Sequence, residues 1–345
     1  MRTGVFHENF AAEEQLWDSS TARRWMLAFT AALFALPLYG SDYVLAMTCI
    51  IGIHVIATLG LNITTGSTGQ ISLAHAAFMG VGCYTVAWLA KHGIPFFIAL
   101  PAAGMLAALI GVLVGLPSLR VKGLYLAIAT LAAHFILTFI FREWEPVTGG
   151  VQGTSIPRAR LFGFELVGDR ANFYLIFGCA FLMALAVRNL ARTHIGRAFI
   201  AVRDRDISAE ILGVSLLRTK LLAFALGAFY AGVAGGLLGY FYGSITPEYF
   251  VLTLSIFYLA AIIVGGSTVL GSILGAMFMT FVPELLRLTS HVSSQWFPGI
   301  AALLLPMGQI VFGVLIIVFL IFEPRGLSAV WARVRRTFHV WPFKT

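Results

Sequence analysis

Charged side chains are scarce in this chain. Asp, Glu, Lys and Arg make up 11% of its 345 residues, whereas they make up about 25% of an average soluble domain. Hydrophobic residues make up 59%, which is more apolar surface than a soluble fold of this size can cover. The composition therefore excludes an ordinary soluble protein. The excess of 23 basic over 15 acidic residues predicts contact with anionic membrane lipid and no nucleic acid.

The sequence also lacks the residue patterns that carry catalysis or metal binding. The three cysteines lie in apolar runs without C-x-x-C spacing, which favours packing roles. There is no G-x-S-x-G elbow, no H-E-x-x-H, and no G-x-x-x-x-G-K-[ST] loop that would bind ATP phosphates. His54, His75 and His134 lie in apolar runs without a second ligand at metal spacing, so we expect hydrogen-bonded interior residues. We therefore expect no catalytic residue, no metal site and no cofactor.

Long apolar runs are abundant instead. A helix needs about 20 such residues to cross the hydrocarbon core of a membrane. The runs lie near residues 25–40, 43–61, 71–90, 96–118, 123–141, 173–187, 221–242, 250–265, 269–286 and 300–322. Several are short, so the count of crossings falls to eight or nine if these do not span. We expect an all-α polytopic membrane protein with about ten (8–10) transmembrane helices.

Basic residues cluster between these runs. Seven Lys/Arg lie in the 188–220 segment, whereas residues 221–322 contain one, Arg287. Dense basic loops mark the cytoplasmic side of a membrane protein. With a cytoplasmic N-terminus, ten spans place Arg120, Lys122, the 188–220 loop and the basic tail on that side. The charge pattern therefore predicts that both termini are cytoplasmic.

The spans divide the chain into three predicted parts. Residues 1–24 form a cytoplasmic segment, 25–322 the transmembrane domain and 323–345 a cytoplasmic basic tail. Apolar residues recur in this tail at near-helical spacing, with Trp331 among them, which favours an amphipathic helix on the membrane surface. A disordered basic tail is the alternative.

Two Gly-Ser-Thr segments interrupt the apolar runs. The first reads T-G-S-T-G-Q-I-S-L-A-H at 65–75, and the second reads G-G-S-T at 265–268. Paired, Gly-interrupted segments indicate a transport pathway, and irregular backbone at membrane depth must face protein or a water-filled cavity. We predict that the first segment lines a substrate path, with a helix starting near 67–70 to meet a carboxylate; a plain cytoplasmic turn is the alternative. The path candidates are Gly66, Ser67, Thr68, Gly69, Gln70, Ser72 and His75.

Several stretches carry a family resemblance. They read G-S-T-G-Q-I-S-L-A-H-A-A-F-M-G-V-G-C-Y at 66–84, I-G-R-A-F-I-A-V-R-D-R-D-I-S-A-E-I-L-G-V from 195, V-P-E-L-L-R at 282–287 and F-E-P-R-G-L at 322–327. From about residue 42 to 328, the chain resembles the LivM-type permeases of bacterial branched-chain amino acid ABC importers. It departs from their pattern at Ala74, where the family usually has Gly before the His.

This resemblance implies a permease subunit of the bacterial inner membrane without its own ATPase site. It would pair with a second homologous permease of the LivH kind, two cytoplasmic ATP-binding subunits and a periplasmic substrate-binding protein. Related systems carry urea, short amides or other small acids, so these remain alternative substrates. A stand-alone secondary carrier and a membrane-embedded enzyme are the alternatives from other classes.

A permease without an ATP site must receive force through a cytoplasmic element, and the 188–220 loop contains a candidate. An A-E-x-x-G pattern ends at Gly213, and residues 207–212 fit a short helix that this glycine terminates. Asp206 or Ser208 would cap its N-terminus. The coupling candidates are Gly196, Arg197, Arg203, Ala209, Glu210 and Gly213. The alternative is that the arginines only fix the topology.

Overall fold

The computed structural model describes most of the chain. The described residues are 24, 33–157, 159–161, 164–165, 168–296, 310, 313–314, 316–319, 321–323 and 326–340. The predicted N-terminal segment 1–24 lies outside them except for Arg24, and the predicted spans 25–40 and 300–322 lie partly outside.

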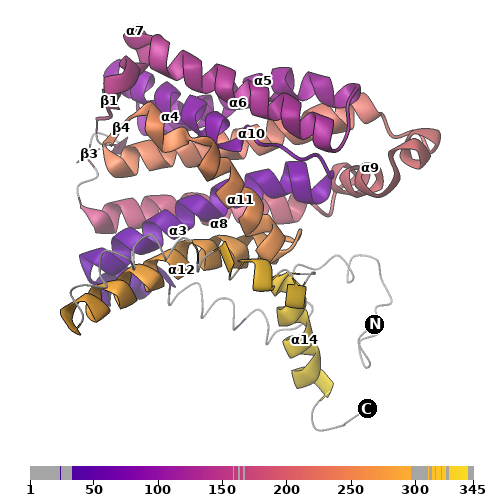
Figure 1. The fold of residues 1–345 in the computed structure, drawn as a ribbon. Coiled ribbons are helices and arrows are strands. Elements are labelled where there is room, and N and C mark those ends of the chain that lie inside the picture. Colours follow the sequence, from indigo (N-terminus) through magenta and orange to yellow (C-terminus); the bar gives the residue numbers. More distant parts are fainter. Residues whose placement is uncertain are drawn as a thin grey trace.

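Helices form nearly all of the described structure (Figure 1). The long ones are α3 (Asp42–Leu61), α4 (His75–Lys91), α5 (Phe96–Gly115), α6 (Leu124–Glu143), α8 (Asp169–Leu190), α9 (His194–Ile211), α10 (Leu216–Tyr242), α11 (Leu252–Gly265), α12 (Val269–Trp296) and α14 (Leu327–Val340). Short turns of helix join them: η1 (Asn62–Ser67), η2 (Leu116–Leu119), α7 (Glu145–Thr148), η3 (Gly150–Gln152) and η4 (Pro247–Phe250). This architecture confirms the all-α prediction.

Many of these helices are apolar enough to cross a membrane. Among the described residues, five have both the length and the hydropathy: Asp42–Ser67, Phe96–Leu119, Leu124–Glu143, Arg170–Leu190 and Leu216–Tyr242. Two shorter apolar helices, Leu252–Gly265 and Val269–Leu285, accompany them. The chain is thus a polytopic membrane protein, whereas the total of about ten spans and the side of each terminus stay predictions.

Helix α10 lies at the centre of the bundle, where it packs against α3, α4 and α5. Its contact with α4 is made by main chain on both sides. A Cβ added to Gly82 would lie 2.1 Å from the carbonyl oxygen of Gly232, and one added to Gly235 would lie 1.9 Å from that of Met79. Glycine is required at this crossing because any side chain would separate the helices.

The two ends of the bundle differ in structure (Figure 1). At one end, the short strand β1 (Thr154–Ser155) pairs antiparallel with β4 (Ser244–Ile245), and β2 (Arg160–Leu161) pairs with β3 (Phe164–Glu165). The Lys91 ammonium at the end of α4 donates to the Thr154 hydroxyl there. Helix α9 projects from the opposite end. The paired strands β1 and β4 and helix α9 therefore lie at opposite ends of the bundle (Figure 1).

Candidate functional site at the α9 junction

The first Gly-Ser-Thr segment extends the preceding helix instead of starting the next one. Helix α3 passes directly into the π-helical turn η1, which ends at Ser67. Gly69 then takes a positive φ of 69°, and the Gln70 amide donates to the Thr64 carbonyl at 3.1 Å. Helix α4 begins only at His75. The prediction of a helix start near 67–70 is therefore wrong, because the left-handed turn at Gly69 reverses the chain before a new helix forms.

The polar side chains of this segment are mostly buried and bonded. The Thr68 hydroxyl donates to the Thr64 carbonyl (2.5 Å) and accepts from the Gln70 amide nitrogen (3.1 Å). The Nε2 atom of His75 lies 2.8 Å from the carbonyl oxygen of Ala57, so His75 is a hydrogen-bonded interior residue. Ser72 is buried as well. The residues that reach an open space are Thr68, Gly69 and Gln70, described below.

The two Gly-Ser-Thr segments meet in space, although 200 residues separate them. A Cβ added to Gly66 would lie 3.2 Å from the Cβ of Ser267. In the second segment, Gly266 has a φ of 94° and ends α11, so that α12 begins as a separate helix. The Thr268 hydroxyl then accepts from the Gly271 amide at 2.9 Å, at the start of α12. The sequence predicts that the two segments belong to one transport pathway, but it does not predict that they touch.

Helix α9 has two parts and contains the predicted coupling residues except Gly213, which follows the helix. Its first part starts at Thr193, whose hydroxyl accepts from the Gly196 amide at 3.4 Å. Arg205 has a non-helical backbone (φ −156°, ψ 94°), so the helix kinks there. The second part ends where Gly213 takes a φ of 89° and the Val214 amide bonds to the Ala209 carbonyl (2.9 Å). The predicted short helix and its glycine terminus are therefore present, joined through the kink to a longer helix.

The second part of α9 exposes an apolar surface. Ile207, Ile211 and Leu212 have relative exposures of 68%, 81% and 83%, and Glu210 beside them is also exposed. Ala209 faces the protein and is 2% exposed. Three large aliphatic side chains on a helix that projects beyond the bundle form an unoccupied contact surface. The sequence predicts a short helix here as the coupling element, but it does not single out these three aliphatic side chains.

Two polar contacts join α9 to the bundle. The Nη1 atom of Arg203 donates to the Gly66 carbonyl at 3.0 Å, and Lys122 forms an ion pair with Asp206. Lys122 holds the pKa of the Asp206 carboxyl below its usual value, first through their hydrogen bond and then through charge attraction. The predicted path segment and the predicted coupling segment are therefore neighbours in one junction.

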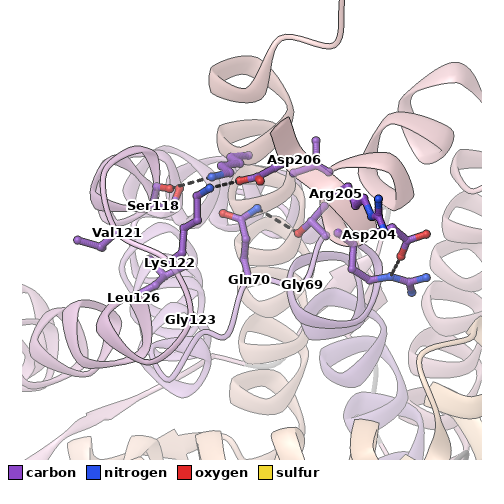
Figure 2. Close-up of a pocket in the computed structure, with 14 residues that line it drawn as sticks. Gly69, Gln70, Ser118, Val121, Lys122, Gly123, Leu126, Asp204, Arg205 and Asp206 are labelled. Carbon is purple, nitrogen blue, oxygen red and sulfur yellow. Dashed lines mark hydrogen bonds and ion pairs between the residues drawn. The ribbon is translucent and has the colours of Figure 1, made fainter. Parts of the chain in front are cut away.

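A cavity of about 210 Å³ lies within this junction, between α9, the residues after η1, the α5–α6 turn and α10 (Figure 2). Its lining residues are Thr68, Gly69, Gln70, Ser118, Val121, Lys122, Gly123, Leu126, Val202, Arg203, Asp204, Arg205, Asp206 and Lys220. Sequence reasoning did not select Ser118 or Lys220. Lys220 carried a signal all the same, because a lysine directly before an apolar run must reach water or a buried partner.

No metal centre accompanies the junction in the part of the chain that the structure describes. No group of three or more His, Cys, Asp and Glu residues there is close enough to hold an ion. His54 bonds through Nδ1 to the Tyr258 hydroxyl at 2.7 Å, which fits an interior role.

Comparison with known proteins defines the class. Residues 43–320 match the family of permease components of branched-chain amino acid transport systems, and the chain belongs to that family. It is 32% identical to the high-affinity branched-chain amino acid transport system permease protein LivM of Escherichia coli K12, over 90% of this chain and 76% of that protein. LivM of Salmonella typhimurium LT2 matches at the same identity and coverage.

The chain also resembles the second kind of permease in these systems. It is 27% identical to a probable branched-chain amino acid transport permease protein LivH of Methanocaldococcus jannaschii, over 82% of this chain and 90% of that protein. No solved structure matches the chain.

Proposed function

We propose that this chain is a transmembrane permease subunit of an ABC importer that carries branched-chain or related hydrophobic amino acids across the bacterial inner membrane. Its proposed partners are a second, LivH-like permease, two cytoplasmic ATP-binding subunits and a periplasmic substrate-binding protein. In this arrangement both termini and α9 are cytoplasmic, residues 25–322 form the permease domain, and residues 188–220 form its coupling loop. Family membership and the basic charge of that loop support the proposal.

The observation that carries the proposal is the exposed apolar surface of α9. Ile207, Ile211 and Leu212 lie beyond the bundle, where a cytoplasmic subunit would cover them. Burial of one such side chain contributes about 1.5–3 kcal/mol to association. Through such a contact, a conformational change in the ATPase would move the permease.

Two structural features would transmit this movement from α9 to the rest of the permease. The kink at Arg205 separates the exposed part of α9 from the part that contacts the bundle. The bond from Arg203 to the Gly66 carbonyl connects the helix to η1 and so to the predicted substrate path. Movement of α9 would thus shift the junction of the two Gly-Ser-Thr segments.

Co-purification tests the proposal. The chain is expressed with the proposed partner subunits, and two variants are compared: Ile211→Ser with Leu212→Ser, and Ile200→Ser. Ile200 is 42% exposed on the first part of α9, so it controls for loss of an aliphatic side chain. We expect the double variant to lose the ATP-binding subunits and the control to keep them.

Retention of these subunits by both variants would overturn the assignment of α9. Substrate uptake that persists without any ATP-binding subunit, driven by an ion gradient, would establish the secondary carrier instead. Uptake of urea or a short amide in preference to leucine would replace the proposed substrate while leaving the permease class in place.

A further inference from the structure

A buried cation lies in the wall of the junction cavity. Lys220 is 5% exposed, and its ammonium donates to the Ser118 carbonyl at 3.2 Å. That neutral acceptor satisfies one of three N–H donors. In the described part of the chain, no carboxylate forms a direct ion pair with Lys220; Asp206 and Glu210 attract it at longer range, and Asp206 pairs directly with Lys122. A buried ammonium without a directly bound counter-ion is costly, so an anion is the expected occupant.

Two further polar groups in the same wall lack a partner. The Ser118 hydroxyl and the Gln70 carbonyl oxygen have no hydrogen bond within the described residues, although their side chains are 1% and 4% exposed. The Gln70 side chain extends toward the Lys122–Asp206 pair (Figure 2). A buried polar group without a bond costs about 1–3 kcal/mol. A ligand in the cavity would supply the missing acceptor for the hydroxyl and the missing donor for the amide oxygen.

The cavity is large enough for a small organic molecule. A single ordered water needs only about 10–15 Å³, whereas this space is about 210 Å³. Its wall also contains aliphatic side chains from three elements: Val121, Leu126 and Val202. Inorganic phosphate would leave these side chains without a partner, and a purely apolar ligand would leave Lys220 without one.

We propose that the cavity is a cytoplasmic binding site for a small aliphatic α-amino acid. The ligand carboxylate accepts from the Lys220 ammonium and the Ser118 hydroxyl. The ligand ammonium donates to the Gln70 amide oxygen and lies near Asp206, and the aliphatic side chain contacts Val202 and Leu126. This inference rests on the proposed function, because such a ligand is the product that the importer delivers to this side.

Occupancy of the site would hold α9 in place. Lys220 belongs to α10, whereas Val202 and Asp206 belong to α9. A ligand between them joins the two helices through its own contacts. Since α9 must move for coupling, the bound amino acid slows ATP hydrolysis by the assembled transporter. The site thus provides inhibition by the accumulated product.

Binding of labelled L-leucine to the full chain in lipid nanodiscs tests the site directly. We expect saturable binding that Ser118→Ala weakens about fivefold, because one hydrogen bond is lost. Lys220→Met should weaken it about tenfold or more, because a charged partner is lost. Ser118→Ala is informative because the hydroxyl has no bond within the described residues and the Lys220 bond uses the main-chain carbonyl. Arg218→Met, an exposed change two residues from Lys220, is the matched control and should bind normally.

Equal binding by the parent, Ser118→Ala and Lys220→Met would overturn the site. Competition by isocaproate, which has the carboxylate and the aliphatic chain but no ammonium, should be much weaker than competition by leucine. Equal competition by isocaproate, or stronger competition by inorganic phosphate, would overturn the amino acid assignment.

The assembled transporter in proteoliposomes separates this inference from the proposed function. Leucine added on the ATPase side should reduce ATP hydrolysis in the parent and in Arg218→Met, and should reduce it less in Ser118→Ala. Leucine uptake without any effect of leucine on the ATPase side would overturn the inference and leave the proposed function intact. Absence of ATP-dependent leucine uptake in the parent would overturn the proposed function.

Discussion

Arg203 donates a 3.0 Å hydrogen bond to the main-chain carbonyl of Gly66, a residue 137 positions earlier in the chain. This bond connects the helix that we assign to ATPase coupling with the segment that we assign to the substrate path. Because the acceptor belongs to the main chain, the bond is removed by a change at Arg203, which also removes the ion pair of Arg203 with Asp204.

We expect Arg203→Met to lower the amount of substrate transported per ATP hydrolysed. The bond is partly exposed and contributes about 1 kcal/mol, so the effect should be roughly fivefold. Transport and hydrolysis are measured together in proteoliposomes that contain the complete transporter. Arg218→Met, which removes an exposed arginine at the same end of the molecule, should change neither rate. An unchanged ratio in Arg203→Met would show that the bond does not transmit force.

The end of α9 gives a second prediction. Gly213→Asp places a side chain at a φ of 89°, which costs about 1 kcal/mol or more. Glu210→Ala removes an exposed charge beside the apolar surface. We expect both variants to insert in the membrane normally but to uncouple ATP hydrolysis from transport. Normal substrate-stimulated hydrolysis in both would contradict the assignment.

Thiol labelling tests whether the 62–75 segment lines the path. Ser67→Cys, Gln70→Cys and Ser72→Cys are treated with a membrane-impermeant thiol reagent in the presence and absence of nucleotide and substrate. Ser67 is half-buried and the other two side chains are buried, so labelling should be slow at rest. We expect the rate to change with nucleotide state and to fall with substrate. Constant rates would favour the plain turn.

The Lys122–Asp206 ion pair predicts a pH dependence of stability. Because the pKa of Asp206 is lowered in the folded state, the pair stabilises the protein at every pH above the unfolded value of about 3.9. Its contribution declines below that value and is lost as the pH falls through the lower pKa of the folded state. Since Lys122 is mostly exposed, the contribution is about 0.2–1 kcal/mol. Asp206→Asn should therefore lower the melting temperature slightly at pH 7 and have a progressively smaller effect as the pH falls below about 3.9, as measured by thermal unfolding in detergent.

The tail supplies the last prediction. Helix α14 is amphipathic, and Arg333 donates to Glu323 at 2.7 Å near its start. Trp331 and Val334 are exposed on it, which suits contact with a membrane surface. Deletion of residues 329–345 should reduce the yield of assembled transporter modestly and leave transport by the assembled fraction unchanged. Complete loss of the inserted complex would contradict a surface role.

Apolar length and charge spacing were sufficient to predict most of the bundle. The runs at 96–118 and 221–242 correspond to α5 and α10, and the basic loop contains α9. Charge spacing also placed Lys122 and the basic loop on one side, and the ion pair to Asp206 joins them. These features depend on local composition, so they can be predicted from the sequence alone.

Other features depend on contacts between residues that are distant in the sequence, and local sequence patterns do not predict them. The approach of Gly66 to Ser267 and the burial of Lys220 against Ser118 arise only when segments distant in the sequence pack together. The boundary of α4 was misplaced for a related reason. Residues 62–67 have no apolar periodicity of their own, and they extend α3 because the bundle supports the π-helical turn.

The crossing of α4 and α10 has a consequence for the opposite end of the molecule. At Gly82 and Gly232 the two backbones touch, so neither helix can slide or rotate past the other without steric collision. We therefore expect the two helices to move together. Lys220 begins this unit near α9, whereas Lys91 at its other end bonds to Thr154, and β4 follows α10 directly. If α9 moves during transport, as we propose, this unit would carry the displacement from the end near Lys220 to the paired strands β1 and β4 at the other end of the bundle.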